Sequence, residues 1–478
     1  MLKNIDSFGN VEAEEDAVLD FFVSMSITEN IETGNSFLVL GRKGSGKTAL
    51  FRYFTEGAHA TRSTGLNLNG YPWKVHETIK DEGVEDVESY VASWKYLIAV
   101  ELAKLVIKSA NRPQMTEVVE IKKFLTDNYG TDKPTIKNIF SLKKLNLSGD
   151  LEPQIFGCKI GKISLQRSDR MRLGHELNAL TDKILSHVAK ISNAADINAL
   201  SLHFDELDRG ITVLSESRKE MIIGLVLAAK ETNKLLRECS LNMKSVIYLR
   251  TDIWEQLKFS DKNKISQTNS DTIEWDDDTL LGLMNKRIKV KLGHEHSWNT
   301  IDDGRRIKRQ PKWKHIIDRS FLRPRDVISF MNLLLEVVKK SDESTVDVFE
   351  NPHVVDARPK YSQYLKHELD DEIATHWGDW ESCLQTLSKL GREYFRADEY
   401  QKAYDEVQQG KSPKYDAQAS LEELYNFGII GYEARSGYGG SGWKTKFANP
   451  ELGWDGNAVR FKVHLGLKEF MKLKEDRS

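Results

Sequence analysis

The sequence predicts an α/β fold with a parallel sheet at its core. Short apolar runs alternate with longer runs of helical periodicity, an order that is typical of parallel sheets. One apolar run, "SFLVL", is followed by the glycine-rich "GRKGSGKT" and then by a helix-like run. The chain has 478 residues, a length that favours roughly two to four domains over a single core.

The glycine-rich loop has the spacing Gly41-x-x-x-x-Gly46-Lys47-Thr48, which is typical of loops that bind phosphate. Glycines allow dihedrals that a side chain would forbid, and they let backbone N–H groups approach an anion. A helix expected from about Lys47 to Phe54 would point its positive end at that anion. Lys47 would reach the β- and γ-phosphates of ATP, and the Thr48 hydroxyl would hold Mg²⁺. A glycine-rich hairpin turn is the alternative, but "ALFRYF" does not alternate as a second strand would. The residues expected to contact the nucleotide are Gly41, Arg42, Lys43, Gly44, Ser45, Gly46, Lys47, Thr48 and Ala49.

Periodicity predicts the other elements in chain order. The long run "DVESYVASWKYLIAVELAKLVIKSA" carries an apolar stripe at steps of three and four, which we interpret as core packing. The remaining expectations are a helix over 11–28, a strand within "TGLNLNGYPWKV", a small β insertion over 111–168, a helix over 169–191, strands within "NALSLHFD" and "SVIYL" with a helix between them, helices over 277–340, a linker over 341–357, and a C-terminal part that ends with a helix, a strand, a Gly/Ser-rich hairpin tip and a returning strand.

An acidic pair ends the predicted strand in "LHFDELDRG". Asp205 would complete the Mg²⁺ shell, and Glu206 would orient or deprotonate the attacking water. A solvated acidic turn after a strand is the alternative. His203 interrupts the apolar run, which is unexpected in a fully buried strand. We interpret it as a core histidine on a sheet face rather than a ligand.

Two arginines are candidates for sensing the γ-phosphate. Arg250 ends "SVIYLR", a strand expected to neighbour the Asp205 strand, and ligands of open α/β sheets bind at the carboxyl ends of strands. The alternative for Arg250 is an ion pair with Asp252 or Asp261. Arg325 follows Pro324 at a predicted helix start, in "FLRPRD".

Arg323 precedes the same proline, and both arginines could reach phosphates from a helical lid. The alternative for this basic helix start is pairing with Asp318 or Asp326. Of the two arginines, Arg325 is the predicted phosphate contact.

Composition excludes several other classes of protein. The formal net charge of −3 rules out a globally basic coat for nucleic acid, although not a local patch. The three cysteines, Cys158, Cys239 and Cys383, are too far apart for a disulfide scaffold or a zinc site. The first ten residues lack the apolar segment of a signal peptide, and no run could span a membrane. A cytoplasmic location is expected.

Together, "GRKGSGKT", "LHFDELD", "YLR" and "RPRD" resemble the AAA+/STAND branch of P-loop ATPases. "DELDRG" is similar to the signature of KAP-type ATPases, and "EWDDDTLLGLMNKRI", with Trp275, Leu280, Leu283 and Arg287, resembles the lid segment of this branch. The tail resembles a winged helix. The resemblance implies an ATPase core over 1–110 and 169–275, an insertion over 111–168, a helical lid over 276–345 and a winged-helix domain over 358–478.

The resemblance further implies a nucleotide switch that hydrolyses ATP to ADP and phosphate with Mg²⁺. The implied catalytic residues are Lys47, Glu206, Arg250 and Arg325, and the implied Mg²⁺ ligands are Thr48 and Asp205. Such proteins often form homo-oligomers in which a neighbouring subunit supplies an arginine, and Arg209 and Arg287 are the candidates here.

Three hypotheses follow for the whole chain. The first is an oligomeric ATPase switch that acts with a separate effector protein, plausibly in bacterial anti-phage defence. The second is a DNA-binding ATPase of the initiator or loader kind, which would use wing residues Arg435, Lys444 and Lys446 and the basic run "RRIKRQPKWKH". However, "SLEELYNFG", which precedes the wing, is acidic and would make a poor recognition helix. The third is a nucleotide-bound scaffold without turnover, which the intact Lys47 and Glu206 disfavour.

Overall fold

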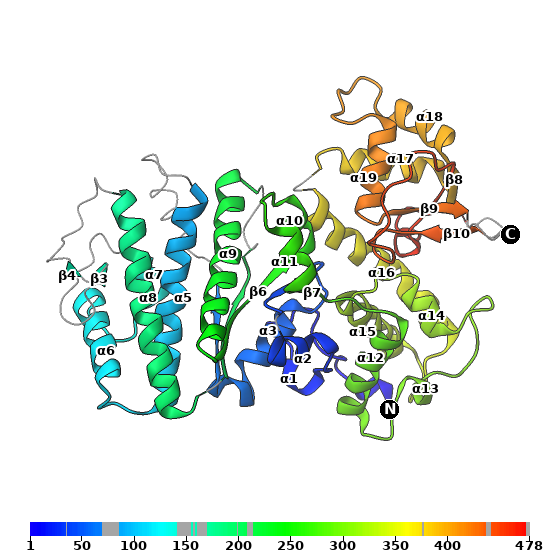
Figure 1. The fold of residues 1–478 in the computed structure, drawn as a ribbon. Helices are drawn as coiled ribbons and strands as arrows, with labels where there is room; N and C mark the ends of the chain where they lie inside the picture. Colours follow the sequence, from blue (N-terminus) through cyan, green and yellow to red (C-terminus); the bar gives the residue numbers. More distant parts are fainter. Residues whose placement is uncertain are drawn as a thin grey trace. The chain divides into compact units, whose positions relative to one another are not determined.

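The structure, a computed structural model, describes residues 1–34, 36–68, 86–140, 154–155, 158–159, 170–197, 199–207, 214–374, 377–435 and 441–474. The chain divides into two compact units, which we treat separately (Figure 1). The sheet unit comprises Ser24–Arg42 and Lys47–Ile273. The terminal unit comprises Met1–Val23, Lys43–Gly46 and Glu274–Ser478. No helix in the described part of the chain is both long and apolar enough to cross a membrane.

The sheet unit is built on a five-stranded parallel sheet in the order β2-β5-β6-β1-β7, which confirms the predicted α/β class. Its strands are β1 (Leu38–Gly41), β2 (Ser63–Asn67), β5 (Ala199–Asp205), β6 (Asn242–Arg250) and β7 (Ser270–Thr272). Its helices are α2 (Ser26–Thr33), α3 (Lys47–Thr55), η2 (Gly57–Thr61), α5 (Asp86–Ala110), α6 (Thr116–Tyr129), α7 (Ile136–Phe140), α8 (Arg170–Ala195), α9 (Glu216–Glu238), α10 (Thr251–Gln256) and α11 (Lys262–Thr268).

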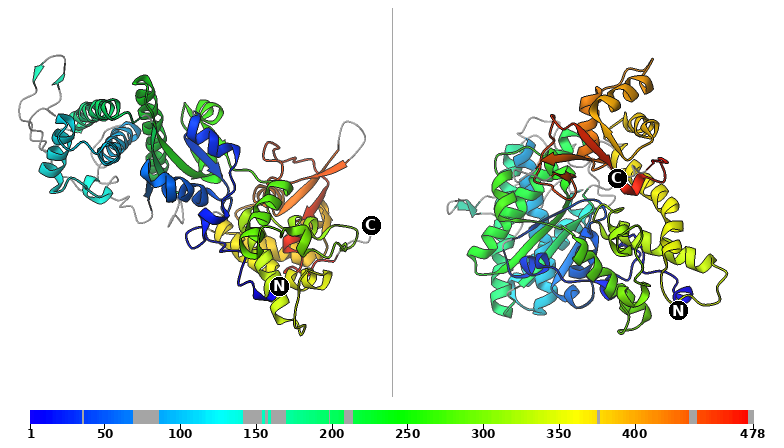
Figure 2. Two further views of the ribbon diagram at one scale, coloured as in Figure 1. Left: turned by 90° about the horizontal axis from the view of Figure 1, so that it is seen from below. Right: turned by 90° about the vertical axis from the view of Figure 1, so that its right-hand side faces the viewer.

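Helices cover both faces of this sheet. On β5, Phe204 meets Trp94 of α5 edge to face, whereas His203 stacks on Phe54 of α3. Because successive residues of a strand point to opposite faces, α5 and α3 lie on opposite sides. Figures 1 and 2 show α8 on the side of α5 that faces away from the strands. The stripe on α5 that includes Trp94 is buried, as predicted.

Two expectations for the first 168 residues need correction. Residues 11–28 do not form one helix: only α1 (Val18–Phe21) and α2 are helical there. The Asp16 and Asn10 side chains instead accept and donate hydrogen bonds within turns, which compete with a helix. In the predicted β insertion, the described residues include the short hairpin of β3 (Gln154–Ile155) and β4 (Cys158–Lys159), but also the helices α6 and α7.

The terminal unit contains a run of helices followed by a four-stranded antiparallel sheet in the order β10-β9-β11-β8. The order of elements in the last part of this unit is that of a winged helix: α17, β8, α18, α19 and then the hairpin β9–β10. Residues 436–440, between the two strands of the hairpin, lie outside the described residues. Its elements are η1 (Leu2–Asn4), α1, α12 (Asp277–Leu292), α13 (Trp298–Ile301), α14 (Lys312–Ile317), α15 (Pro324–Lys340), α16 (Asn351–Ile373), α17 (Trp380–Leu390), β8 (Tyr394–Arg396), α18 (Ala397–Val407), α19 (Ala417–Asn426), β9 (Ile430–Arg435), β10 (Ser441–Lys444), β11 (Arg460–Val463) and η4 (Leu465–Leu467).

The predicted linker over 341–357 is irregular only in its first part. Helix α16 begins at Asn351, with Pro352 in its first turn, where a missing N–H costs little. Val354, Ala357 and Tyr361 are buried at helical spacing along one face. This apolar stripe holds the segment in the core of the terminal unit.

Candidate functional site

The glycine-rich loop joins β1 to α3, as the sequence predicts. Gly44 and Gly46 have φ angles of +80° and +102°, in the region that side chains disfavour, so both positions need glycine. The Lys47 ammonium donates hydrogen bonds to the backbone oxygens of Gly41, at 2.9 Å, and Arg42, at 3.1 Å. The lysine therefore closes the loop at the carboxyl end of β1, where a phosphate-binding lysine is expected.

Strand pairing gathers three of the predicted residues at one edge of the sheet unit. Gly41 on β1 pairs with Arg250 on β6, and Phe204 on β5 pairs with Ile247 on β6. Asp205 follows Phe204 directly, so it ends β5 at the same edge. The prediction that the Arg250 strand neighbours the Asp205 strand is thus confirmed. The carboxyl edge of a parallel sheet is where α/β proteins bind ligands.

The acidic pair at this edge is buried rather than solvated. Asp205 and Glu206 are 4% and 7% exposed, which disfavours the alternative of a solvated turn. Glu206 also has a φ of +61°, an uncommon backbone conformation for a residue with a side chain. Strained backbone of this kind concentrates at functional sites. Asp208, the next acidic residue, lies outside the described residues. So does Arg209, one of the two candidates for an arginine supplied to a neighbouring subunit.

A magnesium ion would find suitable donors at Thr48 and Asp205. A hydroxyl and a carboxylate are hard oxygen ligands, which Mg²⁺ prefers. No group of three or more His, Cys, Asp or Glu side chains placed to hold a metal occurs among the described residues. Mg²⁺ in nucleotide sites is bound by one or two protein groups together with phosphates and water, so two donors suffice.

His203 is a core histidine, as interpreted from the sequence. It is fully buried, and its ring nitrogens lie 3.0 Å from the Tyr248 hydroxyl and 2.9 Å from the Ser201 hydroxyl. Burial, with smaller contributions from Lys244 and His59, lowers the pKa of His203 to about 3. The ring is therefore neutral at physiological pH and fills the space between β5 and α3.

Arg250 forms an ion pair that the sequence left open as an alternative. Its guanidinium donates two hydrogen bonds to the Asp252 carboxylate, at 2.9 and 2.6 Å. Asp261, the other partner considered, instead pairs with Lys230. Arg250 therefore stands at the predicted strand end with a carboxylate bound to it.

The terminal unit contributes contacts to residues 43–46 of the loop. The carbonyl oxygen of Lys43 accepts a hydrogen bond from Arg323 at 3.2 Å, and that of Ser45 accepts one from the Trp275 indole at 2.8 Å. A Cβ atom on Gly44 would lie only 3.0 Å from Cβ of Arg325. Gly44 therefore permits both a left-handed turn and the close approach of α15.

The two arginines that flank Pro324 have different environments. Arg323 is almost completely buried, and it donates two hydrogen bonds to Asp326 and one, at 3.0 Å, to Glu372. Burial alone would lower the pKa of Arg323, but the charges of Asp326 and Glu372 outweigh it and raise the pKa.

Arg325 is one-fifth exposed and donates to Glu368 at 3.0 Å. Asp326 thus pairs with Arg323 rather than with Arg325, and Asp318 pairs with Lys314.

Arg287, the other candidate for an arginine supplied to a neighbouring subunit, is a structural residue in this chain. It is 6% exposed and donates to the Asp16 carboxylate at 2.6 Å and to the Phe8 carbonyl oxygen at 2.8 Å. Its guanidinium also lies over the ring of Phe21. Burial lowers the pKa of Arg287, and Asp16 opposes this effect. An arginine held in this way is not presented to a second subunit.

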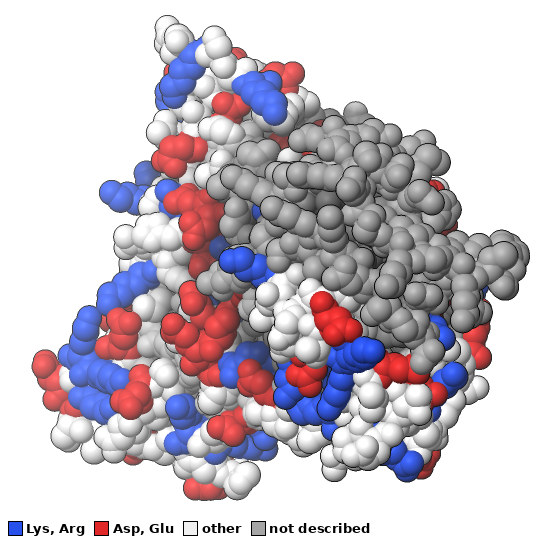
Figure 3. Space-filling view, turned by 90° about the vertical axis from the view of Figure 1, so that its left-hand side faces the viewer, with Lys and Arg blue, Asp and Glu red and all other residues white. Residues whose placement is uncertain are grey.

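Two lysines of the basic run over 305–315 are engaged in ion pairs, whereas Arg305, Arg306, Lys308 and Arg309 are exposed. Lys312 is fully buried and pairs with Asp302 and Asp303, while Lys314 pairs with Asp277 and Asp318. Figure 3 shows a different face, the side that carries α6 and α8 at the left of Figure 1, where Lys and Arg side chains are interspersed with Asp and Glu. Helix α19 before the hairpin carries Glu422 and Glu423, as the sequence indicated.

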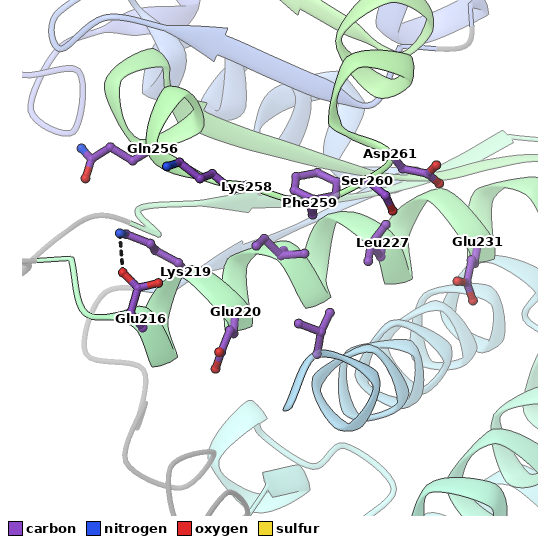
Figure 4. Close-up of a pocket in the computed structure, with 12 residues that line it drawn as sticks. Glu216, Lys219, Glu220, Leu227, Glu231, Gln256, Lys258, Phe259, Ser260 and Asp261 are labelled. Atoms are coloured by element: carbon purple, nitrogen blue, oxygen red, sulfur yellow. Dashed lines mark hydrogen bonds and ion pairs between the residues drawn. The ribbon is translucent and has the colours of Figure 1, made fainter. Parts of the chain in front are cut away.

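A pocket of about 630 Å³ lies elsewhere in the sheet unit, along α9 (Figure 4). Leu227 of α9 faces Phe259 across it, Ile223 is also among its lining residues, and Glu216 pairs with Lys219 at one end. None of the predicted nucleotide residues is among the described residues that line it. The pocket is therefore separate from the described residues that are predicted to contact the nucleotide.

Sequence reasoning missed the two acidic partners of the arginines, Glu368 and Glu372. They are spaced four residues apart on α16, so they share one helix face. Their spacing alone is common among solvated helices. Only the packing of α16 against α15 identifies them as partners of the loop arginines.

Comparisons with known proteins give partial matches. Residues 278–370 match the family described as the FunZ-associated C-terminal helical domain. A putative transposon gamma-delta 80.3 kDa protein of Escherichia coli is 24% identical over 356 residues, which cover 68% of this chain. The chain spans about half, 46%, of the length of that curated relative.

Two solved structures resemble the chain at low identity. The ORC1 protein of Aeropyrum pernix in complex with DNA is 12% identical, covers 93% of this chain and 90% of its own, and gives a TM-score of 0.36. Cdc6p from Pyrobaculum aerophilum is 11% identical, and the match covers 95% of this chain and 90% of Cdc6p, with a TM-score of 0.31. These scores are too low to establish a shared fold.

Proposed function

We propose that this chain binds ATP with Mg²⁺ and hydrolyses it, as an AAA+-type nucleotide switch. The observation that carries the proposal is the edge of the parallel sheet. There the start of the phosphate loop, the buried pair Asp205 and Glu206, and Arg250 come from three adjacent strands. Lys47 and Thr48 begin the helix that follows the loop. Each group matches one requirement of phosphoryl transfer: charge neutralisation, a metal ligand, a base and a sensor.

The roles follow from the chemistry of the side chains. Lys47 would exchange its bonds with loop carbonyls for bonds with the phosphates, and Thr48 and Asp205 would hold Mg²⁺. The metal would neutralise charge on the phosphates. Glu206, buried beside Asp205, would accept a proton from the attacking water. The non-hydrolysing scaffold is disfavoured because the metal and base positions are both filled by residues of the right chemistry.

The decisive experiment compares the wild type with Lys47→Ala in binding of fluorescent ATP. Deleting the ammonium removes a charge-assisted contact to the phosphates, and ATP affinity should fall about a hundredfold. Lys122→Ala, on the distant helix α6, is the matched control and should bind as the wild type does. Unchanged affinity in a folded Lys47→Ala protein would contradict the assignment of the loop.

The finer proposal is that ATP controls assembly. The AAA+/STAND resemblance implies a homo-oligomer or a complex with a separate effector, and the difference between ATP and ADP would act through Arg250 and Arg325. A ligand shifts such an equilibrium only by its differential affinity for the two states. Light scattering with an ATP analogue and with ADP should give different masses. A monomer in both conditions, with no partner-dependent change, would favour a simple ATPase.

DNA binding through the basic run is a weaker candidate, because Lys312 is buried and Lys314 is doubly paired, which leaves Arg305, Arg306, Lys308 and Arg309 as its remaining exposed cations. No contact among the described residues bears on a role in anti-phage defence.

A further inference from the structure

Three cations and three anions of the terminal unit meet where the loop residues 43–46 contact α15 and α16. The cations are on Lys43, Arg323 and Arg325, and the anions are on Asp326, Glu368 and Glu372. Their formal charges cancel. The cluster therefore offers phosphate no net positive charge unless one of its ion pairs opens.

The pairs within this cluster are unequal. Arg323 is held by two carboxylates and is almost completely buried. If Arg323 left these carboxylates to bind a phosphate, Asp326 would remain unpaired in the core. Arg325 is held by Glu368 alone through NH1, and its Nε has no hydrogen-bond partner among the described residues. An arginine has five N–H donors, so Arg325 keeps donors for a second anion.

One oxygen of Glu368 serves two cations of the nucleotide machinery. Oε2 of Glu368 lies 3.0 Å from NH1 of Arg325 and 3.6 Å from Nζ of Lys43. Both side chains are about one-quarter exposed or less, as is Glu368 itself, so these charges are only partly screened by water. A phosphate that approaches the loop competes with this single carboxylate oxygen.

We propose that Glu368 is a positioning residue that holds Arg325 and Lys43 against α16 and competes with the γ-phosphate for them. The proposal rests on the proposed function, because it requires ATP at the loop. When ATP binds, Arg325 exchanges the Glu368 carboxylate for phosphate oxygen, and α16 loses that ion pair with α15. ADP lacks the γ-phosphate and leaves the ion pair in place. Because α16 directly precedes the winged-helix elements in the chain, the exchange makes the attachment of these elements to α15 depend on which nucleotide is bound.

The test measures dissociation constants of a non-hydrolysable ATP analogue and of ADP, both with Mg²⁺. Glu368→Gln keeps the shape of the side chain and removes the competing charge. It should tighten the analogue about three- to tenfold and change ADP less than about twofold. Glu336→Gln is the matched control, because it removes the Glu336–Lys360 ion pair between the same helices, α15 and α16, away from the loop. It should change neither constant.

Two further variants separate competition from a general structural effect. In Arg325→Gln/Glu368→Gln most of the tightening should disappear, because Arg325 is gone and only Lys43, the more distant of the two released cations, remains. Glu368→Asp restores the negative charge and should return the ratio of the two constants towards that of the wild type. Weaker or unchanged analogue binding in Glu368→Gln, or equal tightening of both nucleotides, would overturn the inference. A wild type that binds neither nucleotide would instead contradict the proposed function itself.

Discussion

The carboxyl edge of the sheet and the start of α15 both present charged groups, but they position them by different means. At the sheet edge, Asp205 and Arg250 are placed by strand pairing, because each ends a strand of fixed register. At the start of α15, Arg323 is held by Asp326 of the same helix and by Glu372 of α16, and Arg325 is held by Glu368 of α16. Strand register thus fixes the backbone positions of the first set, although Arg250 also pairs with Asp252, whereas side-chain ion pairs hold the second set.

This difference has consequences for function. Groups fixed by the backbone keep their positions when a neighbouring side chain changes, which suits a metal ligand and a base. Groups fixed by ion pairs can exchange partners, which suits a sensor. Substitutions in the two sets can show whether the sheet edge carries the chemistry and whether the two arginines of α15 differ as their environments indicate.

The largest expected effect is on turnover. Glu206→Gln keeps the size of the side chain but removes the proton acceptor, so ATP hydrolysis should fall about 10²- to 10⁴-fold, with ATP affinity little changed. Phosphate release and nucleotide binding are measured on the same preparation. Glu216→Gln, at an exposed carboxylate on α9, is the control and should retain full turnover. If Glu206→Gln hydrolyses ATP as fast as the wild type, Glu206 is not the general base.

The next effect is on stability at α15. Arg323→Gln leaves the buried Asp326 without its main partner, so unfolding in urea should require about 3–5 kcal/mol less free energy than in the wild type. Asp326→Asn added to this variant should recover part of the loss, because the unpaired charge is removed. If Arg323→Gln lowers the free energy of unfolding by less than about 1 kcal/mol, Arg323 is not more firmly held than Arg325.

The same contrast explains what the sequence could predict. The loop, both strand ends and the class of fold follow from local patterns, because glycine spacing and apolar alternation are set by the backbone. Helix α6 was missed although Val118, Ile121 and Leu125 have helical spacing, since it was grouped with a Gly/Pro-rich segment. The roles of Glu368 and Arg287 depend on contacts between distant segments, and no local pattern contains that information.

A smaller effect concerns the sheet on acidification. The folded-state pKa of His203 is about 3, below its ordinary value near 6.5, so the unfolded chain takes up this proton first as the pH falls. The stability contributed by the neutral ring is complete above pH 6.5. It is lost towards pH 3 at up to about 1.4 kcal/mol per pH unit. Urea unfolding of His203→Gln across pH 4–7 should show a shallower slope than the wild type. Parallel slopes would indicate that His203 does not control this acid sensitivity.

The smallest expected effect separates Arg325 from Arg323. Arg325 and Glu368 are each about one-fifth exposed and share one hydrogen bond, so their pair is partly screened and easily replaced by water. Arg325→Gln should therefore lower the free energy of unfolding by less than about 1 kcal/mol, and the difference should shrink further in high salt. Urea unfolding at low and high ionic strength, with Arg323→Gln measured alongside, provides the comparison. Equal losses in the two variants, insensitive to salt, would mean that Arg325 is as firmly fixed as Arg323. An arginine that cannot leave its carboxylate could not report the γ-phosphate, so this small number decides whether α15 carries a sensor.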